Sequence, residues 1–256
     1  MQNSDIEGEL SKLNQVGLDS LYSVRLMNRV EIKYVFNIRK LTDLIRMLSS
    51  YYHVLEIKNM RILPYSTTYL DTSDYLFYNQ HVRGEFARYK LRYRRYEATN
   101  ESFLEIKKKT NKGRTSKWRV ENINNSGSFD SAATCFISKY LPVSPDLIKP
   151  AIINNFTRIS LAGFGLNERI TIDFNISFSS LENLREISLP YLAIAELKKD
   201  GYSDYSSFRA LMKQLNIYPA GFSKYCIGSA LLNDSVKKNM IKPKLLLINK
   251  LENECN

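Results

Sequence analysis

Cysteine, histidine and proline are scarce in this chain of 256 residues, and it has no long apolar run. Cys135, Cys226 and Cys255 lie far apart with no CxxC pair, which argues against a disulfide framework and a thiolate zinc site. Neither His53 nor His81 has carboxylates or cysteines at ligand spacing. No segment approaches the roughly 20 apolar residues of a membrane-spanning helix, and the N-terminus lacks an apolar signal region. We therefore expect a cytoplasmic protein without a membrane span.

Basic residues, by contrast, are in excess. Lysine and arginine number 37 against 26 aspartate and glutamate residues, for a formal net charge of +11. Such an excess indicates an anionic partner: nucleic acid, a phosphorylated small molecule or an anionic membrane surface. Because the chain shows no recognised RNA or DNA motif, we do not expect nucleic acid to be the main partner. A content of 44% hydrophobic residues is ample for a sizeable core.

The stretch from Arg88 to Glu121 carries the strongest pattern. Read at period two, it predicts three consecutive strands, each with one apolar and one ionised face, and a hairpin turn at 111–113. The ionised positions are Lys90, Arg92, Arg94, Glu105, Lys107, Lys109, Lys117, Arg119 and Glu121. Neighbouring strands with cations at alternate positions form a positive wall that repels itself unless an anion lies against it. The stretch therefore predicts a surface that binds a polyanion.

The same alternation recurs along the rest of the chain. It predicts strands within 24–36, 54–71, 152–160, 168–174 and 191–198, and helices at 37–52, at 132–141, after Ser203 or Asp204, and from 222 toward 232. So many ionised groups can share one face only if that face is wet or filled with ligand, which favours closure of the sheet. We expect an α+β fold: a closed antiparallel β-tunnel of about eight strands, with a charged, mostly basic lumen and a few helices packed outside.

A series of short motifs makes a resemblance specific. In order they are EIK at 31–33, TYLDT at 68–72, KLRYR at 90–94, EIK at 105–107, Lys117, FTR at 156–158, RITID at 169–173, AELK at 195–198 and FSKY at 222–225. This order resembles the VTC domain, the polyphosphate polymerase domain of the vacuolar transporter chaperone family. The resemblance implies a triphosphate tunnel metalloenzyme, in which basic residues hold a triphosphate or a growing polyphosphate. The resemblance covers roughly residues 25 to 230, and residues 1–22 are polar and aperiodic enough to be a loose leader or a peripheral helix. We therefore expect a polar leader (1–22), a single tunnel domain (23–233) and a lysine-rich tail (234–256).

The resemblance also implies which residues form the site. The phosphate-binding positions are Lys33, Lys90, Arg92, Arg94, Lys107, Lys117, Arg158, Arg169, Lys198 and Lys224. Glu196 becomes the leading ligand of Mn²⁺ or Mg²⁺, and Glu31 and Glu105 are further candidates that could equally be salt-bridge partners of tunnel cations. Related tunnel enzymes often open with an ExExK run, and Arg29 stands here where the first glutamate would be. The metal site is therefore expected to hold fewer carboxylates than that of a triphosphatase.

The implied function is a metal-dependent polyphosphate polymerase, which transfers the terminal phosphate of ATP onto a growing inorganic polyphosphate chain. Phosphoryl transfer leaves a protein little covalent work, so arginine, lysine and a metal are the groups that it needs. Two alternatives stay open. One is a triphosphatase acting on inorganic triphosphate or on a nucleoside or RNA triphosphate, and the other is a non-catalytic module that binds polyphosphate or an inositol polyphosphate. A membrane partner that receives the product is compatible with this reading.

Overall fold

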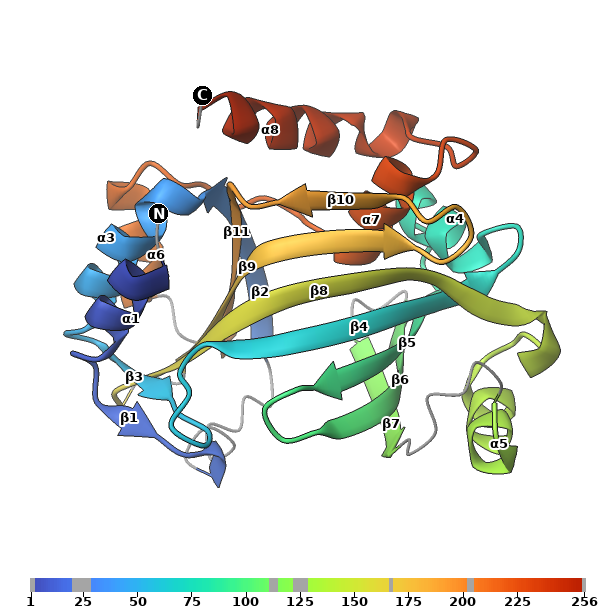
Figure 1. The fold of residues 1–256 in the computed structure, drawn as a ribbon, viewed down its shortest axis with the longest axis horizontal. Coiled ribbons are helices and arrows are strands. Elements are labelled where there is room, and N and C mark those ends of the chain that lie inside the picture. The colour runs from blue at the N-terminus through green and yellow to red at the C-terminus, as the bar shows by residue number, and fades with distance from the viewer. Residues whose placement is uncertain are drawn as a thin grey trace.

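The computed structural model of the chain describes residues 3–19, 29–110, 115–121, 129–165, 168–201 and 205–254. Its fold is α+β, with one large sheet of eleven strands and several helices (Figure 1). Eight strands follow one another across this sheet. In spatial order they are β2 (Arg29–Asn37), β11 (Leu192–Asp200), β9 (Glu168–Ser180), β8 (Ile148–Gly163), β4 (Leu63–Thr72), β5 (Arg88–Tyr96), β6 (Glu101–Lys109) and β7 (Thr115–Glu121).

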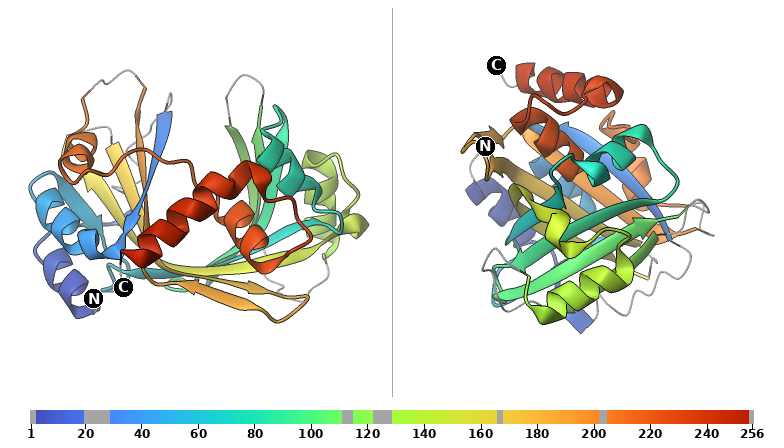
Figure 2. Two further views of the ribbon diagram at one scale, coloured as in Figure 1. Left: turned by 90° about the horizontal axis from the view of Figure 1, so that it is seen from above. Right: turned by 90° about the vertical axis from the view of Figure 1, so that its right-hand side faces the viewer.

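Backbone pairing does not close the predicted tunnel. All eight strands pair antiparallel as expected. Within the described residues, however, β2 and β7 are the two ends of the series, and no ladder joins them. The sheet curls instead, so that these ends form two facing walls (Figure 2). Alternation predicts which face a side chain takes, but it carries no information on whether the last strand meets the first.

Three short strands extend the sheet beyond this series. β10 (Glu186–Leu189) pairs antiparallel with β9, and β3 (Tyr52–Leu55) pairs antiparallel with β8. β1 (Gln15–Val16) runs parallel to β3, so the sheet is not antiparallel throughout. β3 and β4 are the two strands expected within 54–71.

The central stretch folds as three strands, as its alternation predicts. β5, β6 and β7 lie in register, with Arg92 opposite Glu105 and Lys107 opposite Lys117. On the other face of β6, Leu104 and Ile106 are fully buried in a cluster that includes residues of α4 (Leu76–Arg83) and α5 (Ser131–Tyr140). The expected turn at 111–113 lies outside the described residues.

Helices cover the outer face of the opposite wall. α3 (Leu41–Leu48) buries Leu41, Leu44, Ile45 and Leu48, the stripe that its spacing predicts. It follows a 3-10 turn (η1, Ile38–Lys40), where the Asn37 side chain accepts a hydrogen bond from the Arg39 N–H. α1 (Asn3–Leu10) and α6 (Ser207–Gln214) share the same buried cluster (Figure 1). Residues of the expected leader, such as Ile6, thus form part of the core.

Two local predictions are wrong. The aromatic stretch 75–83 reads from its sequence as a turn region, but it forms helix α4 (Leu76–Arg83). At the start of this helix the Asp71 carboxylate accepts hydrogen bonds from the N–H groups of Phe77 and Tyr78. α6 begins after Ser206, whose side chain accepts the Arg209 N–H, and not after Ser203 or Asp204, which lie outside the described residues. In both cases a side chain next to the helix satisfies its first N–H groups.

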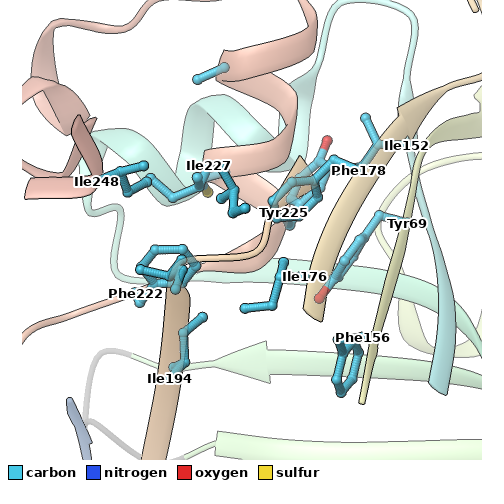
Figure 3. Close-up of a cluster of buried hydrophobic side chains, with 14 of the residues drawn as sticks. Tyr69, Ile152, Phe156, Ile176, Phe178, Ile194, Phe222, Tyr225, Ile227 and Ile248 are labelled. Carbon is cyan, nitrogen blue, oxygen red and sulfur yellow. The ribbon is translucent and has the colours of Figure 1, made fainter. Parts of the chain in front are cut away.

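The C-terminal helices sit between and over the two walls. α7 (Lys224–Leu232) packs on the inner face of the sheet, where Phe178 and Ile152 lie next to it (Figure 3). A Cβ added at Gly228 would meet the Phe178 ring at 2.4 Å, so only glycine allows this close approach. α8 (Lys242–Asn253) follows 3-10 turn η3 (Asn239–Ile241) and packs near β2, where the Asn37 side-chain amide donates to the Leu251 carbonyl at 2.9 Å. None of the described helices is long and apolar enough to cross a membrane.

Candidate active site

A cavity of about 700 Å³ lies on the inner face of the sheet. Each of the eight strands of the series contributes to its lining. The basic lining residues are Arg92, Arg94, Lys107, Lys117, Arg119, Arg158, Arg169 and Lys198, and the acidic ones are Glu31 and Glu101. These side chains converge because residues two apart on a strand share a face, and because the strand registers align those faces.

Seven of the ten predicted phosphate-binding residues line this cavity: Arg92, Arg94, Lys107, Lys117, Arg158, Arg169 and Lys198. The other three gather at the start of α7. Lys33 donates to the Phe222 carbonyl at 3.1 Å, and Lys90 donates to the Ser223 hydroxyl at 3.1 Å. Lys224 is the first residue of α7. Arg119 also lines the cavity; alternation along β7 places it on the charged face, but the motifs of the resemblance do not include it.

Glu105 is a buried counter-ion. The Arg92 guanidinium donates to its Oε2 from Nε at 2.8 Å and from Nη2 at 2.6 Å, and the Lys117 ammonium contacts its Oε1. Burial alone would raise the pKa of Glu105, but Arg92, Arg94 and Lys117 outweigh it and hold this pKa well below its usual value. Its side chain is 0% exposed, so Glu105 does not fit the role of metal ligand.

Glu196, on the other wall, also lies between two cations, but its side chain is partly exposed to solvent. Its Oε1 lies 2.8 Å from the Lys198 ammonium, and its Oε2 lies 3.4 Å from the Lys33 ammonium. Burial raises its pKa, and the two lysines lower it further than burial raises it, so the pKa ends well below its usual value. The side chain keeps 22% exposure. Glu196 is thus ionised at neutral pH and partly exposed beside Lys198, which lines the cavity, although Glu196 is not itself among the lining residues.

Asp173 forms a third arrangement of this kind; it belongs to the RITID motif but is not among the predicted site residues. Arg158 donates to it from Nε at 2.5 Å and from Nη2 at 2.8 Å, and the Lys224 ammonium contacts its Oδ2. Burial lowers the pKa of Lys224 to about 7 although Asp173 opposes this change. Asp173 shares the inner face of β9 with Arg169 and Thr171, and that alternation is the signal that could have found it. It connects the cavity to the three lysines at the start of α7.

Two cations of the cavity, Arg94 and Lys107, form no ion pair within the described residues. Arg94 as a whole residue is 8% exposed, and its guanidinium donates to the Thr67 hydroxyl at 3.3 Å. Burial, Arg92 and Arg158 all lower the pKa of Arg94. The pKa of Lys107 falls well below its usual value because of Arg92, burial and Arg94. Crowded cations of this kind are stabilised when an anion lies among them.

Aromatic rings also contact these cations. The Arg158 guanidinium lies 5.1 Å from the centroid of Tyr65 and 5.2 Å from that of Phe156. Lys224 lies over the Phe156 ring at 3.2 Å. Cation–π contacts favour a positive charge without neutralising it, so Arg158 and Lys224 still attract an anion.

A divalent metal fits this site only together with phosphates. The described residues hold no group of three or more histidine, cysteine, aspartate or glutamate side chains that could bind an ion. Glu196 and Glu31 do lie on neighbouring strands, diagonal in the register that pairs Lys33 with Glu196 and Glu31 with Lys198. One or two carboxylates plus substrate phosphates is the usual set for Mg²⁺. Glu196 and Glu31 therefore fit an ion that arrives with its phosphates.

A model of the VTC domain family matches residues 28–128 and 138–233, so the chain belongs to the VTC domain family. No curated protein matches the chain. It resembles the solved structures of two candidate adenylate cyclases. The one from Vibrio parahaemolyticus has 14% identity over 79% of this chain and 99% of that chain, with a TM-score of 0.47. The one from Bacillus halodurans has 16% identity over 77% and 96%, with a TM-score of 0.48.

A third solved structure with this likeness comes from Hippeastrum. It is a candidate adenylyl cyclase, HpAC1, described as having a dominant triphosphatase activity. Its identity is 13% over 82% of this chain and 98% of that chain, with a TM-score of 0.49.

Proposed function

We propose that the cavity holds a chain of phosphates and that the protein transfers the terminal phosphate of ATP onto inorganic polyphosphate. The observation that carries this proposal is the charge of the lining, with eight basic side chains against two acidic ones. Because Arg94 and Lys107 have no ion pair in the described residues, an anion with several charges along its length suits them better than a single phosphate. Membership of the VTC domain family supports the same substrate class.

Each type of side chain has its own part in this reaction. Arginine binds two phosphate oxygens at once, so Arg94 and Arg158 would fix the orientation of the phosphates. Lys107 and Lys198 would add point charges from β6 and β11 and so neutralise the transferred group. Alignment and charge neutralisation are the main contributions that a protein makes to phosphoryl transfer. A metal held by Glu196 and Glu31 would add positive charge at the phosphate oxygens.

The test is to incubate the purified protein with ATP and Mn²⁺ or Mg²⁺ and to separate the products by chain length on a gel. A ladder of long chains is expected. Arg94→Met, which removes a cation without breaking an ion pair of the described residues, should abolish the ladder, whereas Lys139→Met on exposed α5 should not. Free phosphate without chains would show a triphosphatase instead.

One observation favours a second candidate, a module that binds polyphosphate without turnover. Glu105, Glu196 and Asp173 each already contact two cations, and the described residues contain no larger carboxylate group for a metal. ATP that stays intact with every metal, combined with tight binding of tripolyphosphate in calorimetry, would establish this candidate.

A further inference from the structure

The turn between β9 and β10 exposes two leucines. Leu184 is 89% exposed, and Leu181 is 47% exposed. The backbone of Leu184 is left-handed, with φ of 54°, a conformation that glycine and asparagine adopt readily and leucine does not. Leu184 therefore stabilises neither the core nor the turn. Residues that their surroundings hold in such an unfavourable conformation are often found at functional sites.

The residues on both sides of Leu184 attach this turn to the segment that follows α7. The Asn183 side-chain amide and the Arg185 guanidinium each donate to the Leu232 carbonyl at 3.3 Å. Arg185 also forms an ion pair with Asp234 at 3.0 Å. The exposed leucine thus has a fixed position next to the segment that leads into η3 and α8.

That segment is strongly basic. Residues 234–250 include five lysines and a single acidic residue, Asp234. Lys238 pairs with Asp234 at 2.8 Å, and the other four lysines form no ion pair within the described residues. The five are Lys237, Lys238, Lys242, Lys244 and Lys250. None of them is among the residues that line the cavity, so the proposed phosphate site does not account for their charge.

The outer face of α8 combines lysine with leucine. Lys242, Leu246 and Lys250 follow one another at four-residue spacing, so they share one face of the helix, and all three are exposed. Leu246 is 57% exposed, and Met240 in η3 is 67% exposed. α8 is also the outermost element on its side of the molecule (Figures 1 and 2). Nothing within the described chain covers this basic face.

The apolar side chains of this surface stand singly. Leu184, Met240 and Leu246 come from three separate elements, with lysines between the last two in the sequence. A protein–protein interface usually has a contiguous apolar centre that is depleted of charged residues. A bilayer surface has no fixed shape, so single apolar side chains can enter it separately while its anionic headgroups attract lysines. The pattern therefore fits a bilayer better than a protein partner.

We propose that the β9–β10 turn, η3 and α8 form a docking surface for a lipid bilayer that contains anionic lipids. The lysines of residues 234–250 contact the headgroups, and Leu184, Met240 and Leu246 enter the layer between them. Because none of these residues lines the cavity, docking does not depend on the proposed function. The surface holds the protein reversibly at the membrane, through charge and a few apolar side chains.

The test is to sediment the purified full chain with lipid vesicles, without nucleotide or polyphosphate. Vesicles of phosphatidylcholine and phosphatidylserine in equal amounts should bind the protein at least about tenfold more tightly than vesicles of phosphatidylcholine alone. Added salt should weaken this binding, because it screens the attraction between lysines and headgroups. Equal binding to both kinds of vesicle, or binding to neither, would overturn the proposal.

Leu184→Asn tests the apolar contact. Asparagine suits the left-handed backbone, so this variant should keep or raise its melting temperature and yet bind the mixed vesicles about threefold or more weakly. Tyr51→Asn is the matched control. Tyr51 is 41% exposed beside β3, which pairs with the end of β8 far from the β9–β10 turn, so its loss should leave vesicle binding as it is. Full vesicle binding in Leu184→Asn would contradict the assigned contact.

The combined change of Lys242→Glu and Lys250→Glu tests the charge. It should weaken binding to the mixed vesicles at least about tenfold, whereas Lys139→Glu on exposed α5 should change it by less than about twofold. Arg94→Met, which removes a cation of the cavity, should bind vesicles as the unmodified protein does. Binding that survives the combined change, or that is lost in Arg94→Met, would place the lipid elsewhere and overturn the proposal.

Discussion

Two carboxylates on opposite walls of the sheet each contact two basic side chains but differ in burial. Glu105 lies between Arg92 and Lys117 with its side chain 0% exposed, and we call this group the buried clamp. Glu196 lies between Lys33 and Lys198 with 22% exposure, and we call this group the open clamp. A fully buried carboxylate and its cations depend on one another, whereas a partly exposed carboxylate can exchange partners. A carboxylate between two cations can therefore either stabilise the fold or interact with a ligand, depending on its burial.

The largest effect is expected in the buried clamp. Glu105→Gln keeps the shape of the side chain but leaves Arg92 and Lys117 without their counter-charge. Breaking a buried ion pair by removing one partner destabilises a fold by ~3–5 kcal/mol. Urea unfolding without ligand should show this loss, and Glu121→Gln on exposed β7 should change the free energy of unfolding by less than about 0.5 kcal/mol. An unaltered unfolding midpoint in Glu105→Gln would show that the buried clamp does not stabilise the fold more than the open clamp does.

The open clamp should show the reverse behaviour. Under the proposed function, Glu196→Gln is expected to lower stability less than Glu105→Gln does and to leave tripolyphosphate affinity largely as it is. It should lower turnover about 10²-fold, the size of effect seen when one charge-stabilising group is lost. Steady-state rates with ATP and Mn²⁺, measured beside melting temperatures, check this outcome. Full metal-dependent turnover in the variant would mean that Glu196 is only a salt-bridge partner of Lys33 and Lys198.

The third carboxylate, Asp173, yields a smaller effect that depends on pH. Lys224 contacts it, and burial places the pKa of Lys224 at about 7, so this lysine is charged below pH 7 and increasingly neutral above it. A phosphate favours the charged form, so binding should take up a proton and weaken as the pH rises from 7 to 9. Lys90, whose pKa burial also lowers to about 7, adds to the same trend.

Calorimetry of tripolyphosphate at pH 8 in two buffers of different ionisation enthalpy measures this proton uptake. Lys224→Arg keeps its charge at this pH and should reduce the uptake, while Lys242→Arg on exposed α8 should not. Equal proton uptake in the unmodified protein and in Lys224→Arg would show that Lys224 does not titrate on binding.

The sequence predicted the local features well because their causes are local. Alternation placed the charged and apolar faces of β5, β6 and β7, and helical spacing found the buried stripe of α3. Both follow from the geometry of a strand or a helix over a few residues. Helix α4 was not predicted, because its first N–H groups are bound by the Asp71 carboxylate. The aromatic residues of this stretch give no sign of that contact.

The sequence could not show that Glu105 is buried and Glu196 partly exposed, because the ion pairs of both clamps depend on pairings between strands. Read alone, Arg92 is one cation in a repulsive wall, and its removal would be expected to relieve that repulsion. In the structure Arg92 binds buried Glu105, so removal of Arg92 should instead leave the Glu105 carboxylate without one of its counter-charges and destabilise the fold. Burial of Glu105 and exposure of Glu196 depend on how the sheet curls, and no spacing along one strand records that curvature.

The attachment of α7 to β2 also has a consequence for the order in which the chain is made. Lys33 on the first long strand donates to the carbonyl of Phe222, and 189 residues separate the two. At synthesis rates of ~5–20 residues per second, this partner leaves the ribosome about 10–40 s after the strand does. In the described residues β2 pairs in the main sheet with β11 alone, which is made late as well. The nascent chain must therefore keep this edge from pairing with other strands throughout that interval.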